Sequence, residues 1–246
     1  MPATLARENT MTPSYRITAM AAACLAIGLG VQEAQAADPA RPAVVELFTS
    51  QGCSSCPPAN DNLAILAGRP EILALSFGVT YWDNLGWKDT FASPTFTARQ
   101  WDYARSLRHR QVWTPQMVFN GRSDVTGASR GEIDRALRTA DRGAGGPALS
   151  MTGETISVGA GRPPAGGADV WLVRYDPRTV QVPVRRGENS GLTLPHRNVV
   201  REFVRIGRWT GQPLSITVLR SHDRGLMTAV LLQAGQGGPI VAASKG

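Results

Sequence analysis

Two cysteines separated by two residues, Cys53 and Cys56, constrain this chain most strongly. An apolar run, Val44 to Phe48, precedes the pair, and a segment with helical spacing, Pro57 to Ala67, follows it. A dithiol placed where a strand turns into a helix is typical of redox sites. Unpaired N–H groups and the helix dipole favour a thiolate at a helix N-terminus, and the thiolate is the nucleophile of disulfide exchange. We therefore predict that Cys53 is the nucleophile and the more exposed and more acidic of the two thiols, and that Cys56 is the resolving thiol, buried behind it.

A second signal is the segment Trp113 to Gly121. It has the pattern of a strand that begins at Thr114-Pro115 and ends in an Asn120-Gly121 turn. Together with the Cys-x-x-Cys, these residues resemble the thioredoxin superfamily. The resemblance implies that Pro115 is a cis-proline facing the cysteines and that Thr114, which precedes it, tunes the thiolate.

The N-terminus has the pattern of an export signal. Arg16 precedes an apolar run from Ile17 to Val31, and Ala34-Gln35-Ala36 follows as a cleavage site. We predict that residues 1–36 are a signal peptide, that the mature protein is periplasmic or secreted, and that Cys24 is removed. No later segment is apolar enough to span a membrane, so we predict no stable membrane insertion after cleavage.

Export changes how the two remaining cysteines are interpreted. An oxidising compartment permits disulfides, but a disulfide that closes a two-residue loop contributes little stability. A redox or metal-binding role for the cysteines is therefore favoured over a purely structural one. A Cys-x-x-Cys with one distant histidine is a possible copper or zinc site. The candidate histidine, His109, lies between Arg108 and Arg110, which fits a solvated basic residue better. We therefore predict no metal and no cofactor.

Charge and motifs exclude several functions. Residues 38–147 contain 12 Lys and Arg against 11 Asp and Glu, whereas residues 148–246 contain 12 against 6. The basic excess of the second half fits an anionic partner or simple solubility. The chain shows no basic helix, aromatic ladder or zinc finger for nucleic acid, no phosphate-binding loop, no Ser-His-Asp pattern and no paired carboxylates.

The first half has the periodicity of alternating strands and helices. Ser93-Pro94 has the pattern of a helix start, and Ser129 with Glu132 has the pattern of a capping box. The expected order is strand, helix, strand, helix, strand, strand, helix. The expected strands are 44–48, 72–79, 117–119 and 124–126, and the expected helices are 57–67, 94–107 and 129–140.

The second half is expected to be rich in strands. Its candidates are 148–158, 169–175, 199–206, 214–219 and 226–233, separated by Gly and Pro clusters. We therefore predict an α/β fold class: a thioredoxin-like domain at 38–142, a linker at 143–147, and a small β-rich domain, an antiparallel sheet or sandwich, at 148–246.

A longer resemblance covers most of the mature chain. Glu46 to Pro58, Tyr81 to Asp89 and Thr114 to Gln116 are similar to exported bacterial proteins of domain-of-unknown-function family 1223. The resemblance implies a thioredoxin-like fold and no established substrate. The leading hypothesis is a thiol–disulfide oxidoreductase whose partners are protein thiols or disulfides. The alternative is a non-catalytic adaptor or copper/zinc-binding module.

The sequence allows two interpretations for each of three further sets of residues. Glu46 is either a proton shuttle for the dithiol or an acid with a local structural partner. Trp82 and Trp87 either line a groove beside the cysteines or pack their segment onto the core. The polar segment Arg185 to Asn189 either reaches the site or forms a turn.

Overall fold

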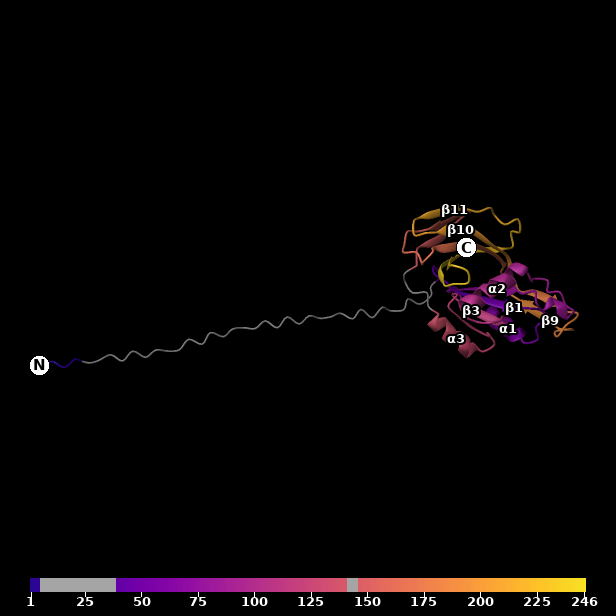
Figure 1. Cartoon of the computed structure of the whole chain (residues 1–246), viewed down its shortest axis with the longest axis horizontal. Coiled ribbons are helices and arrows are strands. Elements are labelled where there is room, and N and C mark those ends of the chain that lie inside the picture. Colours follow the sequence, from indigo (N-terminus) through magenta and orange to yellow (C-terminus); the bar gives the residue numbers. More distant parts are fainter. Residues whose placement is uncertain (5–38, 141–145) are drawn as a thin grey trace. The chain divides into compact units, whose positions relative to one another are not determined.

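In a computed structural model of the protein, the described residues are 1–4, 39–140 and 146–246 (Figure 1). The predicted signal peptide beyond its first four residues, its cleavage site, and residues 143–145 of the predicted linker lie outside the described residues. Within the described residues, no helix is long and apolar enough to cross a membrane. Those from residue 39 onward belong to one compact unit.

The first half contains the helices, in the order that the sequence predicted. Ser93 caps the second helix, since its Oγ accepts a hydrogen bond from the Thr95 N–H at 3.3 Å. Ser129 makes no side-chain cap, so the predicted capping box is wrong. The elements are β1 (Ala43–Thr49), α1 (Pro57–Leu66), β2 (Ile72–Gly78), the 3-10 helix η1 (Asp83–Leu85), α2 (Pro94–Ser106), β3 (Gln116–Phe119), β4 (Ser123–Val125) and α3 (Arg130–Thr139).

The described part of the second half, from residue 146 onward, contains only strands. They are β5 (Leu149–Thr152), β6 (Thr155–Val158), β7 (Ala168–Asp176), β8 (Val180–Pro183), β9 (Thr193–His196), β10 (Val199–Trp209), β11 (Leu214–Thr217), β12 (Met227–Ala234) and β13 (Ile240–Lys245).

The predicted fold class is wrong, because strands of both halves form one mixed sheet. Its order is β13-β12-β7-β10-β2-β1-β3-β4, so β10 completes the edge of β2 that a separate first domain would leave open. The join is made by Val199, which pairs with Ser76, and by Asn198. The Asn198 carbonyl accepts the Ser76 N–H at 2.9 Å, and its side chain donates to the Ala74 carbonyl at 2.7 Å. The protein is therefore mostly β, built on an eight-stranded sheet.

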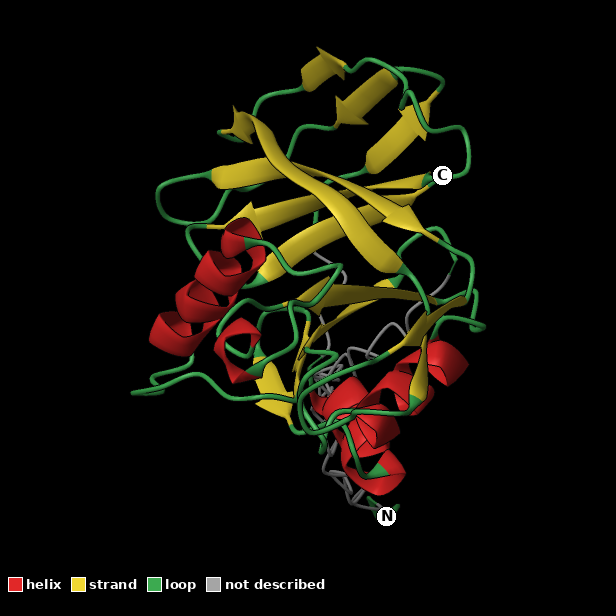
Figure 2. Cartoon of the chain, turned by 90° about the vertical axis from the view of Figure 1, so that its right-hand side faces the viewer, coloured by secondary structure: helices red, strands yellow, loops and turns green. Residues whose placement is uncertain are grey.

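Helices cover only part of this sheet, and strands form the rest of the molecule (Figure 2). Helices α1 and α3 pack on one face through an apolar cluster that includes Leu63 and Ile133. Helix α2 packs on the opposite face. A three-stranded sheet, β11-β6-β5, covers the strands contributed by the second half through a cluster that includes Trp209.

The core beneath α2 crosses the join between the two halves. It contains Phe96 and Tyr103 of α2, Phe77 of β2, and Phe203 and Leu231 from the second half. Burial of this continuous apolar surface favours the two halves folding together. That residues 38–142 and 148–246 are separate domains stays a prediction.

Candidate functional site

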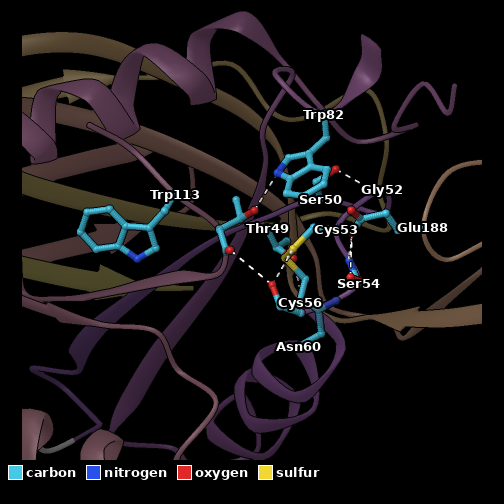
Figure 3. Close-up of a disulfide and its surroundings, with 12 residues drawn as sticks. Thr49, Ser50, Gly52, Cys53, Ser54, Cys56, Asn60, Trp82, Trp113 and Glu188 are labelled. Atoms are coloured by element: carbon cyan, nitrogen blue, oxygen red, sulfur yellow. Dashed lines mark hydrogen bonds between the residues drawn. A yellow bond between two sulfur atoms is a disulfide. The ribbon is translucent and has the colours of Figure 1, made fainter. Parts of the chain in front are cut away.

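Cys53 and Cys56 form a disulfide in the turn between β1 and α1 (Figure 3). Strand β1 ends at Thr49, and Cys56 is the residue immediately before α1. The two Cα atoms lie 5.4 Å apart, within the normal span of a disulfide. The predicted strand–turn–helix placement of the pair is confirmed.

Burial of the pair differs from the prediction. Cys53 and Cys56 are both fully buried, whereas Ser54 and Ser55 between them are exposed. The turn folds back on itself, because the Cys56 N–H donates a hydrogen bond to the Cys53 carbonyl at 3.2 Å. Trp82 packs beside Gly52, the residue before Cys53. The expectation that Cys53 is more exposed than Cys56 is therefore wrong.

The start of α1 offers few donors to a thiolate. Pro57 and Pro58 have no N–H, and the next two N–H groups, of Ala59 and Asn60, already bond to the Cys56 carbonyl at 3.0 and 3.1 Å. The hydroxyl of Ser55 lies 3.3 Å from the Cys53 sulfur. A Cys53 thiolate would thus rely on a neighbouring hydroxyl more than on the helix backbone.

Thr114 contacts residues around the disulfide, whereas the expectation that Pro115 faces the cysteines stays a prediction. The bond between Thr114 and Pro115 is cis. The Thr114 carbonyl accepts the Ser55 hydroxyl at 3.5 Å, and its Oγ1 accepts the Trp82 indole N–H at 2.7 Å (Figure 3). These contacts bring the two sequence signals together at one surface.

The segment after β2 holds the turn that leads to Cys53. The Trp87 indole donates to Gln51 Oε1 at 2.9 Å, and the Asp89 carboxylate accepts the Gln51 N–H at 2.7 Å. Burial raises the pKa of Asp89 above its usual value. Trp113 points away from the disulfide (Figure 3) and lies edge-on to His109. Trp82 and Trp87 thus brace the cysteine turn.

A loop from the second half closes over the same turn. Between β8 and β9, Glu188 Oε2 accepts the Ser54 N–H at 3.0 Å and the Ser54 hydroxyl at 2.7 Å. The buried Asn189 amide donates to the Gln51 and Cys53 carbonyls at 2.9 and 2.8 Å. The Ser54 hydrogen bonds lower the pKa of Glu188. The sequence of this loop is compatible with a contact to the site and with a simple turn, because no local signal distinguishes the two.

Glu46 lies in β1 but faces away from α1. Its neighbours Val45 and Leu47 pack on the α1 side, and alternation places its carboxylate under α2. There it accepts hydrogen bonds from Arg99 at 2.8 and 2.9 Å and from Tyr103. Burial raises the pKa of Tyr103 well above its usual value, which keeps the phenol protonated as a donor.

The Arg99 guanidinium completes this buried cluster. It donates to Gln233 of β12 at 3.1 Å and lies 4.2 Å from the centre of the Phe203 ring. The cluster therefore ties β1, α2 and strands of the second half together. Local structural partners, rather than the cysteines, satisfy the Glu46 carboxylate.

The described residues contain no group of three or more His, Cys, Asp or Glu side chains positioned to hold a metal ion. His109 instead lies 3.1 Å from Asp124. His196 is buried beside Phe91, and burial lowers the pKa of its imidazole to about 4.

One family model matches this chain, and its family has no assigned function. The family model described as "Protein of unknown function (DUF1223)" matches residues 44–233. A crystal structure of protein AGR_C_4864 from Agrobacterium tumefaciens is 36% identical, covers 82% of this chain and 92% of its own, and superposes with a TM-score of 0.69. HBP35 of Porphyromonas gingivalis shares the fold with a TM-score of 0.57 at 11% identity, covering 84% of this chain and 74% of its own. No curated protein matches significantly. The chain belongs to the DUF1223 family.

Proposed function

We propose that this protein is an exported thiol–disulfide oxidoreductase whose reacting atoms are the sulfurs of Cys53 and Cys56. The observation that carries the proposal is their disulfide, set at the start of α1 with the Ser55 hydroxyl and the Thr114 carbonyl beside it. The disulfide closes so short a loop that chain-entropy stabilisation is small, which argues against a purely structural role. The A-x-A sequence ending at Ala36 supports export.

The chemistry is a two-electron exchange. In the reducing direction, the Cys53 thiolate attacks one sulfur of a substrate disulfide, and the other substrate sulfur leaves as a thiol after taking up a proton. Cys56 then loses its proton and attacks the Cys53 sulfur. That step forms the internal disulfide and releases the second substrate thiol, so the substrate gains the two electrons that the dithiol loses.

The exposed pair Ser54-Ser55 marks the surface where a partner would approach. Both side chains lie between the cysteines, and Ser55 reaches Thr114 on the neighbouring segment. A partner thiol or disulfide that docks here must loosen the turn, because both cysteines are buried in the closed arrangement. We therefore expect protein thiols or disulfides as substrates.

Turnover of a model protein disulfide, such as insulin reduced by dithiothreitol, tests the proposal. We expect the mature chain to accelerate the reaction and Cys53→Ser to abolish the acceleration. The double variant Cys53→Ser/Cys56→Ser is the matched control for the same fold without thiols. A wild-type rate equal to that of the double variant would reject the oxidoreductase and leave a non-catalytic adaptor as the function that fits complete burial of the pair.

A further inference from the structure

We propose that Glu188 and the proline-blocked start of α1 bias the Cys53–Cys56 pair toward its disulfide, so that the reduced protein serves as an electron donor that reduces substrate disulfides. This inference rests on the proposed oxidoreductase function and assigns its direction. Pairs with one architecture range from reductants to strong oxidants, and a strong oxidant is one whose reduced form is stabilised. The structure shows three features that disfavour the thiolate of the reduced form.

Missing donors are the first feature. A thiolate at a helix start is stabilised by free N–H groups of the first turn. Here Pro57 and Pro58 remove two of these groups, and the N–H groups of Ala59 and Asn60 are occupied by the Cys56 carbonyl. The described donor that contacts the Cys53 sulfur is the Ser55 hydroxyl, whose one proton is shared with the Thr114 carbonyl.

Negative charge is the second feature. The Glu188 carboxylate takes both the N–H and the hydroxyl of Ser54, the residue that directly follows Cys53. The carboxyl group of Asp89 accepts the N–H of Gln51, two residues before Cys53. Among the described residues, Glu188 forms no ion pair with a lysine or arginine, although Arg185 and Arg186 precede it in the loop. A carboxylate beside a developing thiolate disfavours it.

Burial is the third feature and acts in the same direction. Both cysteines are fully buried, and desolvation disfavours a charged sulfur relative to the neutral disulfide. All three features therefore destabilise the reduced, thiolate form. In the reaction sequence, an upstream dithiol donor of still lower potential must return two electrons to the pair after each reduction of a substrate disulfide.

Equilibration of the mature protein with glutathione buffers tests the inference, with the oxidised fraction measured by alkylation and intact-mass analysis. In a buffer whose reduction potential equals the standard potential of the glutathione couple, we expect the disulfide form of the protein to exceed the dithiol form by about tenfold or more. A tenfold change in this equilibrium corresponds to about 30 mV. A pair that is mostly dithiol in this buffer would overturn the assignment.

Glu188→Gln removes the negative charge but keeps the hydrogen bonds, because the amide oxygen can still accept from the Ser54 N–H and hydroxyl. At pH 9, where thiolate is populated, we expect an equilibrium shift of about threefold toward the dithiol, since Glu188 is exposed and solvent screens it. The shift should shrink at pH 7 and in 1 M salt. Glu132→Gln, at an exposed acid in the first turn of α3, is the control and should change nothing. A Glu188→Gln effect that is absent or independent of salt would contradict the electrostatic role.

The outcomes separate this inference from the proposed function. If the wild-type pair exchanges with glutathione and reduces insulin but rests mostly as dithiol, only the direction is wrong. If the pair neither exchanges nor turns over, both the proposed function and the inference fail.

Discussion

Asn189→Ala is the perturbation that most directly tests how the cysteine turn is held shut. The Asn189 amide is buried and donates two hydrogen bonds, to the Gln51 carbonyl at 2.9 Å and to the Cys53 carbonyl at 2.8 Å. Each bond contributes about 1 kcal/mol, so alanine should lower the free energy of opening this turn by about 2 kcal/mol. That difference makes the open turn roughly 30-fold more populated.

The assay is the rate at which a small phosphine reduces the Cys53–Cys56 disulfide, which requires the buried sulfurs to become accessible. We expect reduction of Asn189→Ala to be roughly 30-fold faster than that of the wild type. Asn62→Ala is the matched control. Asn62 is buried too and donates two hydrogen bonds, to the carbonyls of Gly127 and Ala128 at 2.9 and 3.1 Å, at the side of α1 that packs near α3.

Asn62→Ala should therefore lose a similar amount of unfolding free energy in urea without accelerating reduction. Equal acceleration in both variants would show that general destabilisation exposes the disulfide. No acceleration in Asn189→Ala would show that the loop between β8 and β9 does not control access. Either result would refute the reasoning.

Two further predictions concern stability, and both are checked by urea unfolding. Glu46→Ala should cost about 3–5 kcal/mol, because it leaves the buried Arg99 charge without its partner. Glu71→Ala, which removes a partly exposed pair with Arg69, should cost under about 1 kcal/mol, and equal costs would contradict the burial argument. Burial lowers the pKa of His196 to about 4, so the unfolded chain binds more protons as the pH falls from 7.5 to 5, and the wild type should lose about 2 kcal/mol from this residue. The unfolding free energy of His196→Gln should lack that part of the pH dependence. The same pH dependence in His196→Gln and the wild type would contradict a contribution from His196.

Local signals in the sequence predicted the parts of the site that depend on neighbouring residues. An apolar strand, two closely spaced cysteines and a helical pattern placed Cys53 and Cys56 at the start of α1. Ser93-Pro94 predicted the start of α2, and the resemblance at Thr114-Pro115 predicted the cis bond. Each of these depends on backbone and capping preferences over a few residues, which a single sequence carries.

Long-range pairing is what the sequence could not specify. The segment 72–79 was predicted as a strand, but its apolar pattern says only that both faces are covered and not which strand completes its free edge. The partner is β10, far along the chain, and that pairing places strands of both halves in one sheet. The same limit applies to Glu188 and Asn189, which look like an ordinary polar turn until the sheet brings them onto Ser54 and Cys53.

Trapping of mixed disulfides tests the central claim, a reactive Cys53–Cys56 pair with assigned roles, most directly. The mature chain with Cys56→Ser is incubated with a model protein disulfide and analysed by intact mass under non-reducing conditions. We predict that Cys56→Ser accumulates a covalent adduct through Cys53, because no resolving thiol remains to release it, and that Cys53→Ser forms none. Adducts formed mainly by Cys53→Ser would reverse the roles, and adducts formed by neither variant would contradict the claim that this pair performs disulfide exchange.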